Sequence, residues 1–182
     1  MTERIIFGGF GGQGVVTLGK LAAAVAMREG REVTCISSYG PEVRGGTVYC
    51  NVIISEEPIY SPIIEEADAL ILFNQLSYDK FRPRLREGGL MILNSSLAET
   101  DPALERTRRA ERILIPATEA ANEIGTVLVT NVLLLGAYCA ARNVLPARAV
   151  LAEMEEIAKG KTHLLEVNRL AFHKGEELAR RA

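Results

Sequence analysis

The chain has 182 residues, of which 48% are hydrophobic, so its length and composition predict one globular domain with a full core. Its 21 basic and 23 acidic residues give a formal net charge of −2, which argues against nucleic-acid binding through net charge. The arginines between residues 106 and 112 are interleaved with glutamates, a pattern typical of a solvated surface.

The cysteine content and the hydropathy restrict the function further. Cys35, Cys50 and Cys139 are far apart in the sequence, and an odd number of cysteines without a secretory leader predicts reduced thiols and a cytoplasmic protein. Three thiols cannot supply the four ligands of an iron–sulfur cluster, and no cysteine lies near His163 or His173, so no metal site is expected. No segment is long and apolar enough to predict a membrane span or a signal peptide.

Hydrophobic periodicity predicts a chain that alternates between strands and helices. Strands are expected over residues 4–8, 32–36, 47–54, 69–73, 89–93 and 112–115. Helices are expected over residues 13–29, 77–85, 117–123, 130–142, 146–158 and 161–180. Gly30 is expected to end the first helix, and Thr130 or Asn131 to cap the fourth.

The order of these elements predicts the fold class. The first strand, helix and second strand read as a βαβ unit with parallel strands. The next strand follows after a short connection rich in glycine, too short for a crossover helix, so an antiparallel or edge strand is expected there. The pattern predicts a single-domain, Rossmann-like α/β fold with a doubly wound, mostly parallel sheet, one antiparallel excursion and a helical C-terminus.

The segment FGGFGGQGVV, residues 7–16, fits the pattern G-x-G-x-x-G between a strand and a helix. Such glycines allow a tight turn, close approach of a ligand to the backbone and close helix packing, and the helix N-terminus favours an anion. A structural corner without a ligand also fits the motif. The extra Gly12 and the polar Gln13 favour a bare backbone that meets a phosphate or another subunit.

Two nucleotide-binding motifs are incomplete in this region. A nicotinamide dinucleotide site requires an acidic residue at the end of the second strand, but Ser37 and Ser38 stand there. Residues 14–21 resemble the beginning of a Walker loop, yet Leu21 replaces the Ser or Thr that would bind Mg²⁺. Lys20 is therefore interpreted as a surface or interface charge.

A second unusual segment, SYGPEVRGG, holds large functional side chains among turn residues. Loops that follow strand carboxyl ends converge on one crevice, so this segment is expected beside the glycine turn. Arg44 suits a carboxylate or phosphate, although Glu42 and Arg44 also suit a pair with each other. Polar residues at two later strand ends, 74–75 and 94–96, are expected to face the same crevice. No histidine or nucleophile–base pair accompanies them, so no catalytic residue is expected.

The segments GGFGGQGVV and SYGPEVRGGTVYCNVIIS together resemble the gamma subunit, or gamma domain, of 2-oxoacid:ferredoxin oxidoreductases. The resemblance continues through PIYSPIIEEADALILFNQLS, GGLMILNSS, IPATEAANEIG, TNVLLLGAY and EVNRLAFHKGEE. It covers nearly the whole chain. It therefore implies one domain of the pyruvate/ketoisovalerate oxidoreductase gamma type over residues 1–182.

The resemblance implies a subunit of a complex that decarboxylates a 2-oxo acid with thiamine diphosphate, passes electrons through iron–sulfur clusters to ferredoxin and forms an acyl-coenzyme A. It places thiamine diphosphate and the 4Fe–4S clusters on alpha and beta partner subunits. This chain is then expected to be inactive alone and to bind no cofactor alone. The size of the chain favours the 2-oxoglutarate type, with pyruvate, branched-chain, aryl and indolepyruvate types left open.

The resemblance also implies where this chain contributes to the complex: at the subunit interface and at the coenzyme A side of the active site. The residues carried over to that face are Gly11, Gly12, Gln13, Gly14, Tyr39, Glu42, Arg44, Gly45 and Gly46. Phosphate groups of coenzyme A at a helix N-terminus suit the physical argument above. Two alternatives remain, a dinucleotide-binding Rossmann module and a purely structural adaptor.

Overall fold

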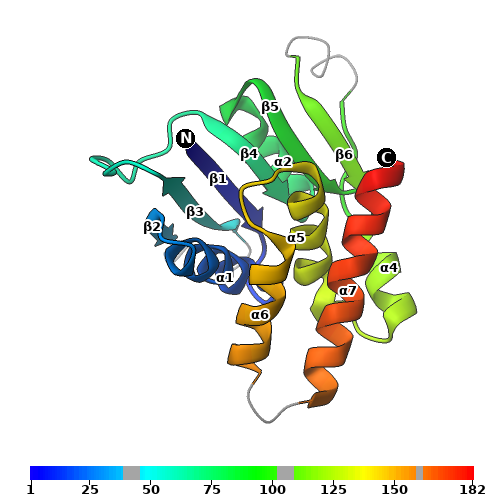
Figure 1. The fold of residues 1–182 in the computed structure, drawn as a ribbon. Coiled ribbons are helices and arrows are strands. Elements are labelled where there is room, and N and C mark those ends of the chain that lie inside the picture. Colours follow the sequence, from blue (N-terminus) through cyan, green and yellow to red (C-terminus); the bar gives the residue numbers. More distant parts are fainter. Residues whose placement is uncertain (39–45, 102–108, 159–161) are drawn as a thin grey trace.

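The described strands form one six-stranded sheet in the computed structural model, which describes residues 1–38, 46–101, 109–158 and 162–182. The strands are β1 (Thr2–Gly9), β2 (Glu32–Ser37), β3 (Val48–Ser55), β4 (Ala67–Leu72), β5 (Leu85–Asn94) and β6 (Glu111–Ile115), in the order β2-β3-β1-β4-β5-β6 (Figure 1). The pairs β1–β4, β4–β5 and β5–β6 are parallel, whereas β3 is antiparallel to both of its neighbours. The predicted mostly parallel sheet with an antiparallel excursion is confirmed.

The position of β3 corrects the expectation of a simple βαβ unit. β1 and β2 run in the same direction, but they are not neighbours, because β3 lies between them and pairs with both. A short connection after β2 can only return the chain antiparallel beside it, and the other edge of β3 then pairs with β1. The sequence predicted the direction of this strand but not that it would separate the first two.

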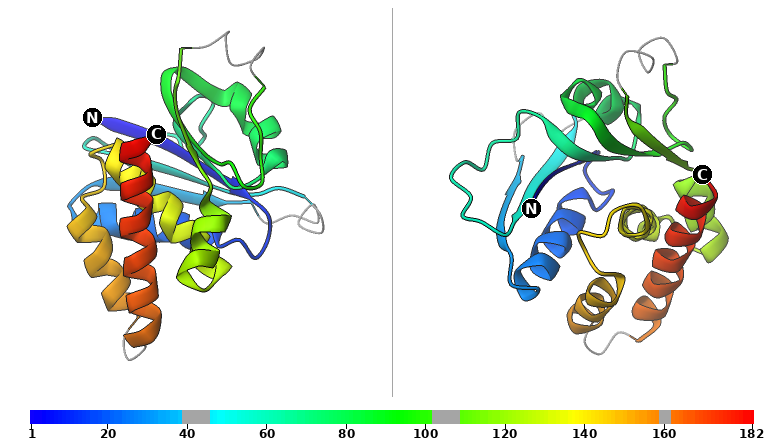
Figure 2. Two further views of the ribbon diagram at one scale, coloured as in Figure 1. Left: turned by 90° about the vertical axis from the view of Figure 1, so that its right-hand side faces the viewer. Right: turned by 45° about the horizontal axis from the view of Figure 1, so that its top comes forward.

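The helices cover the two faces of the sheet unequally. They are α1 (Val15–Arg28), α2 (Gln75–Phe81), α4 (Ala117–Ile124), α5 (Thr130–Ala141), α6 (Ala147–Ile157) and α7 (Thr162–Arg181), with the 3₁₀ turns η2 (Arg82–Arg84) and η3 (Val127–Val129). α2 packs on one face, and the other α-helices gather on the opposite face, as the right-hand view of Figure 2 shows. Helices on both faces confirm the doubly wound arrangement.

Two local predictions about helices are wrong. The helix expected over residues 77–85 ends at Phe81, because Pro83 lies in the 3₁₀ turn η2 and Leu85 already begins β5. α5 begins after Val129 without a side-chain cap. Thr130 instead donates its hydroxyl to the Val127 carbonyl, because η3 leads directly into the helix and leaves no extended capping position.

Strand alternation divides the core between the two faces. On β1, Ile5 and Phe7 contribute to the cluster under the helix-rich face, and Ile6 contributes to the cluster under α2. The central strand β4 is buried along its whole length, as is typical of a parallel strand covered on both faces. Within the residues that the structure describes, no helix is long and apolar enough to cross a membrane.

Candidate functional site: the glycine turn at the carboxyl edge of the sheet

The glycine turn connects the end of β1 to the beginning of α1, and Gln13 holds it in shape. The Gln13 side-chain oxygen accepts hydrogen bonds from the backbone N–H of Phe10 at 2.7 Å and from the Asn74 amide at 3.0 Å. The Gln13 N–H donates to the Phe10 carbonyl at 3.3 Å. Gln13, expected on the ligand-facing side, therefore braces the turn against the end of β4.

Gly12 and Gly14 both adopt positive φ angles, of 87° and 76°, and such angles favour glycine. The space around the two residues differs. A side chain at Gly14 would collide with the Asn131 side chain, which donates to the Gly14 carbonyl at 3.5 Å. A side chain at Gly12 would meet no atom within 4 Å. Gly14 is thus fixed by packing inside the protein, whereas Gly12 leaves its backbone open to the outside.

The N-terminus of α1 is available to an anion. Gly14 is its N-cap, no side chain of the described residues caps it, and its first turn carries no acidic residue. The first N–H groups of the helix therefore lack a capping side chain, and the helix dipole adds positive potential there. A hollow of about 310 Å³ lies beside this terminus, lined by Gly11, Gly12, Gly14 and residues 15–17 among others.

The described ends of the second motif lie beside the glycine turn. Ser38 and Val48 line the same hollow as Gly12, and the Ser38 N–H donates to the Tyr49 carbonyl at 2.9 Å. Gly46 lies in a half-buried bend just before β3. The remaining residues predicted for this face, Tyr39, Glu42, Arg44 and Gly45, lie outside the described residues.

A second hollow, of about 270 Å³, lies on the other side of Gly12, between the turn and η3. Large exposed apolar side chains surround the turn and this hollow, and we call them the apolar rim: Phe10, Leu97, Val127 and Leu128. Leu128 is 76% exposed. Single exposed apolar residues are ordinary, but several around one site indicate a surface that meets another molecule.

Two of the polar residues expected in this crevice from the later strand ends, Asn74 and Asn94, serve the fold instead. Asn74 is buried and caps α2, where its side chain accepts from the Ser77 N–H at 2.9 Å. Asn94 is fully buried: it donates to the Phe73 carbonyl and to the Thr118 hydroxyl, and it accepts from the Ala117 N–H at 3.0 Å. The expectation that these two side chains face the crevice is wrong, because both amides are buried and join strand ends to helices.

The topology argues against a dinucleotide site more strongly than the missing acid does. In a dinucleotide-binding domain the acidic residue follows the strand next to β1. Here β3 occupies that neighbouring position, so the end of β2 lies two strand spacings, roughly 10 Å, from β1. None of the described residues that line the two hollows carries an ionisable side chain.

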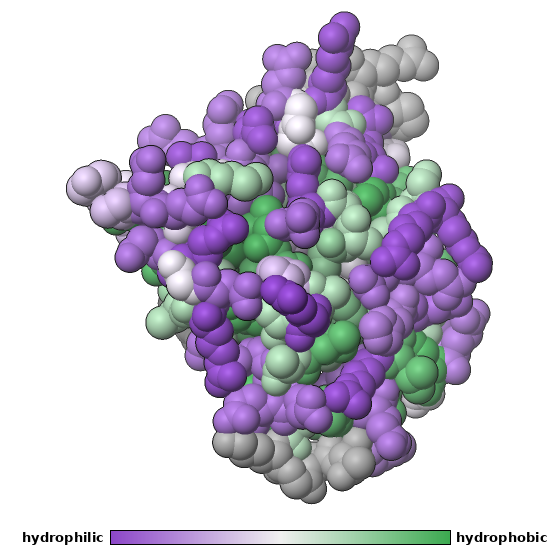
Figure 3. Space-filling model, viewed as in Figure 1, coloured by the Kyte–Doolittle hydropathy of each residue, from purple (hydrophilic) through white to green (hydrophobic). Residues whose placement is uncertain are grey.

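Sequence reasoning missed a larger apolar groove of about 560 Å³ that follows α1. α1 contributes Leu21, Ala24 and the exposed Lys20, and α6 and α7 contribute Ile157 and Leu164 among the residues of the opposite wall. Figure 3 shows hydrophobic residues exposed among hydrophilic ones on this helix-covered face. The exposed Ile157 and Leu164 could have indicated it, but the periodicity of each helix does not reveal which helix faces which.

The fold and the site together define a Rossmann-like α/β domain whose first glycine turn is open to an anion or a partner but lacks the rest of a dinucleotide site. Residues 4–178 match the family described as pyruvate ferredoxin/flavodoxin oxidoreductase. The chain is 36% identical over 185 residues to the 2-oxoglutarate synthase subunit KorC of Methanocaldococcus jannaschii, covering 99% of this chain and 95% of that protein.

Other relatives agree with this match. The ketoisovalerate oxidoreductase subunit VorA of Methanothermobacter marburgensis is 34% identical over 179 residues, which are 98% of this chain and 37% of VorA. The crystal structure of the keto/oxoacid ferredoxin oxidoreductase gamma subunit from Geobacter sulfurreducens PCA superposes with a TM-score of 0.84 at 31% identity, covering 99% of both chains. The chain belongs to this family, as a gamma subunit of the 2-oxoacid:ferredoxin oxidoreductases.

Proposed function

We propose that the chain is the gamma subunit of an enzyme of the 2-oxoglutarate type, with residues 1–182 forming one gamma-type domain. The relatives named KorC are 31–36% identical and match this chain over most of their own length. The pyruvate/ketoisovalerate common gamma subunits of two Thermococcus species are 30% identical over 86–87% of this chain. The ketoisovalerate subunit VorA is 34% identical over 98% of this chain, but the match covers only 37% of VorA. The KorC relatives are matched over most of their own length, and this supports 2-oxoglutarate as the substrate of the complex.

We propose further that the glycine turn forms the coenzyme A side of the active site, at the interface with the partner subunits. The observation that carries this proposal is the uncapped N-terminus of α1, which opens into the hollow lined by Gly11, Gly12 and Ser38. Backbone N–H groups at a helix N-terminus bind phosphate groups well. Gly12 allows close approach because it places no side chain in that space.

The apolar rim supports a partner at the same edge. Phe10 and Leu128 flank the glycine turn on its two sides, and Leu97 lies next to α2 because its carbonyl accepts from the Gln75 N–H at 3.1 Å. Such side chains become buried when subunits assemble, and they exclude water from the site between them. This arrangement favours an interface that closes around the turn.

The other parts of the chemistry belong, in this proposal, to partner subunits. Thiamine diphosphate and the 4Fe–4S clusters lie on the alpha and beta subunits, and ferredoxin meets the complex there. Within the described residues, His, Cys, Asp and Glu form no group of three that could hold a metal. We retain the cytoplasmic location predicted from the three cysteines as part of the proposal.

A solved relative from Magnetococcus marinus bears on the fold of this chain. That structure, a 2-oxoglutarate:ferredoxin oxidoreductase with 2-oxoglutarate, coenzyme A and succinyl-CoA bound, superposes with a TM-score of 0.88. The superposition covers all of our chain and 31% of the Magnetococcus marinus chain, and the two are 24% identical. The likeness therefore extends to the fold alone. The proposed coenzyme A side of this chain therefore depends on its own geometry.

Reconstitution tests this proposal. The full chain alone is expected to be colourless and to reduce no ferredoxin with 2-oxoglutarate and coenzyme A, because the described residues that line the site hold no catalytic pair. Adding it to purified thiamine-binding alpha and beta subunits is expected to restore coenzyme A-dependent reduction, faster with 2-oxoglutarate than with pyruvate. Turnover by the lone chain, or full activity of the partners without it, would refute the subunit role. Higher activity with pyruvate would refute the substrate type.

The dinucleotide alternative has its own test. NADH fluorescence, measured while the full chain is titrated in, is expected to show no saturable change, because β3 separates β1 from the end of β2. A saturable change would instead favour a dinucleotide-binding module.

A further inference from the structure

Two cysteines that are far apart in the sequence meet on the edge of the sheet. Cys35 lies on β2 and Cys50 on β3, and their sulfur atoms are 3.5 Å apart. In the strand register Cys35 is opposite Val52 and Cys50 is opposite Ser37, so the two side chains are diagonal neighbours on one face. The two strands are hydrogen-bonded neighbours, which holds this pair in place.

The surroundings give the two thiols different roles. Cys35 is exposed, whereas Cys50 is fully buried under α1. The Cys50 sulfur packs against Gly19, where a side chain on the helix would collide with it. The absence of a side chain at Gly19 therefore allows Cys50 to sit beneath the helix, beside Cys35.

The same arrangement activates Cys35. A hydrogen bond with Cys50 lowers the pKa of the Cys35 thiol to about 7, and the charge of Lys20 on α1 adds to this effect while burial opposes it. The hydrogen bond to Cys35, burial and the charge of a Cys35 thiolate all raise the pKa of Cys50. Cys35 is therefore the nucleophile near neutral pH, and Cys50 is the resolving thiol, which stays protonated until the second step.

We propose that Cys35 and Cys50 form a thiol–disulfide exchange site that accepts small-molecule disulfides. The Cys35 thiolate attacks one sulfur of the small disulfide, which forms a mixed disulfide and releases one thiolate. Cys50 then loses its proton and attacks the Cys35 sulfur, forming the Cys35–Cys50 disulfide and releasing the second thiolate. The two protein thiols are oxidised and the small disulfide is reduced to two thiols. The two protons lost by the cysteines protonate the two released thiolates.

The second step is favoured by the first. The thiolate charge of Cys35 disappears when the mixed disulfide forms, and two of the causes that raise the pKa of Cys50 disappear with it. The bond encloses residues 36–49, which include the whole segment SYGPEVRGG. The site is independent of the proposed function, because Cys35 and Cys50 meet within this chain and need no partner subunit.

Cys139 provides an internal control. It is half-buried on α5, and burial together with Glu176 raises its pKa to about 12. It is therefore expected to react much more slowly than Cys35 with the same disulfide.

Incubation of the full chain with glutathione disulfide tests the proposal, with non-reducing peptide mapping by mass spectrometry as the readout. The wild-type protein is expected to yield a peptide that links Cys35 to Cys50, with no lasting glutathione adduct and with reversal by dithiothreitol. Cys50→Ser is expected to stop at a stable glutathione adduct on Cys35, and Cys35→Ser to leave Cys50 unmodified. Cys139→Ser is expected to link like the wild type.

Other outcomes overturn the proposal. A glutathione adduct that persists on Cys35 in the wild type, or a wild-type chain that is not modified at all, contradicts the exchange site. Faster reaction at Cys139 than at Cys35 contradicts the assigned nucleophile. Cys50→Ala, with circular dichroism as a check on folding, replaces Cys50→Ser if a buried hydroxyl prevents folding.

Discussion

At the scale of single residues, side-chain amides decide how the ends of the strands are joined. Gln13 bridges the glycine turn to Asn74, and Asn94 bridges the end of β5 to the first turn of α4. Each amide satisfies backbone or side-chain groups that would otherwise be buried without a partner. These residues therefore set the shape of the carboxyl edge.

Glu3 is a residue whose charge opposes folding. It is 6% exposed near the beginning of β1, and its carboxylate accepts from the buried Tyr138 hydroxyl at 3.3 Å. Burial first, and repulsion by Asp68 second, raise the pKa of Glu3, although Arg142, Tyr138 and Arg86 act in the opposite direction. The folded state thus favours protonated Glu3. The stability that the protonated form contributes is lost as the pH rises through the pKa of Glu3 in the folded state.

Glu3→Gln is accordingly expected to raise the melting temperature relative to the wild type at about pH 8, because glutamine keeps an acceptor for Tyr138 without the charge. The difference is expected to narrow as the pH falls towards about 4, where the glutamate becomes protonated. Thermal unfolding, monitored by circular dichroism, measures the melting temperatures of the two proteins at each pH. The exposed Glu123→Gln serves as the control, and a lower melting temperature for Glu3→Gln at the higher pH would contradict this account.

The sequence predicted the position of the glycine turn but not the roles of its side chains. Gln13 was expected to face a ligand, and the amides at positions 74 and 94 to face the same crevice, because polar residues at strand ends often bind ligands. The same residues are equally suited to capping helices and bracing turns. Only the three-dimensional contacts decide between these uses, and the cysteine pair likewise depends on a strand register that sequence spacing does not reveal.

At the scale of elements, the crossing of α5 and α7 depends on glycine. A side chain at Gly136 of α5 would collide with the backbone carbonyl of Phe172, and one at Gly175 of α7 with that of Leu133. The two backbones therefore approach closely where these glycines lie. α5 is buried along most of its length, so this contact fixes the centre of the helix-rich face.

Gly175→Ala tests that crossing. We expect it to lower the free energy of unfolding by about 3 kcal/mol, since overpacking against a backbone exceeds the gain in helix propensity from alanine. The control is Glu166→Ala on the exposed surface of α7, expected to change stability by less than about 0.5 kcal/mol. Chemical denaturation measures both, and equal midpoints for the two variants would contradict a close crossing.

Most elements were predictable because their hydrophobic patterns are strong, as in β4 and α1. The order of the first three strands was not, since a short connection specifies antiparallel pairing with β2 but not which strand lies on the other side of β3. The end of α2 was misplaced because a proline can stand in the 3₁₀ turn that follows a helix.

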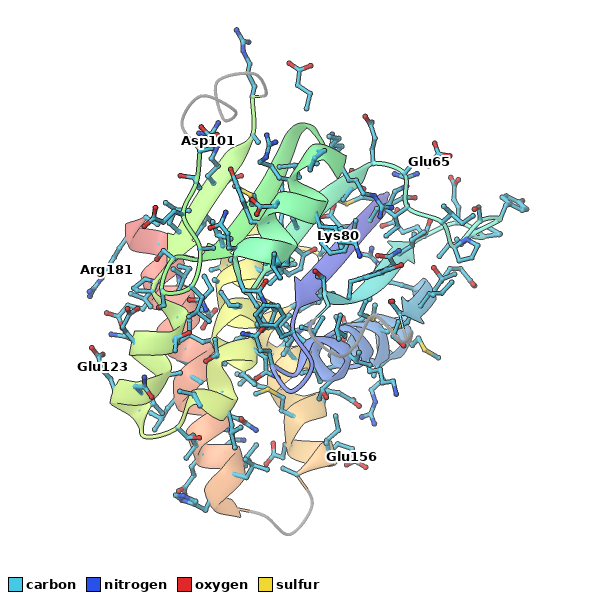
Figure 4. The ribbon with its side chains drawn as sticks, turned by 180° about the vertical axis from the view of Figure 1, so that it is seen from behind. Glu65, Lys80, Asp101, Glu123, Glu156 and Arg181 are labelled. Atoms are coloured by element: carbon cyan, nitrogen blue, oxygen red, sulfur yellow. The ribbon has the colours of Figure 1, made fainter. Side chains whose placement is uncertain are left out.

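At the scale of the whole molecule, the two faces of the sheet differ in what they leave exposed. The view from behind in Figure 4 shows α2, with Lys80 labelled, as the helix on that face. The Lys80 ammonium lies 5.2 Å from the centre of the Tyr49 ring and 5.5 Å from the centre of the Phe81 ring. The Lys80 side chain therefore covers this aromatic pair. The open glycine turn and the apolar rim gather instead at the carboxyl edge of the sheet, where the proposed partner and coenzyme A would meet.

The most direct test of that central claim is the KM for coenzyme A of the reconstituted complex carrying Gly12→Ala. Alanine at a positive φ shifts or strains the turn and adds a methyl group beside the hollow at the N-terminus of α1, so we expect the KM to rise roughly tenfold. Gly30→Ala is the matched control, because Gly30 also has a positive φ and open space but lies at the other end of α1. An unchanged KM in a fully assembled Gly12→Ala complex, or the same rise in Gly30→Ala, would contradict contact between this turn and coenzyme A.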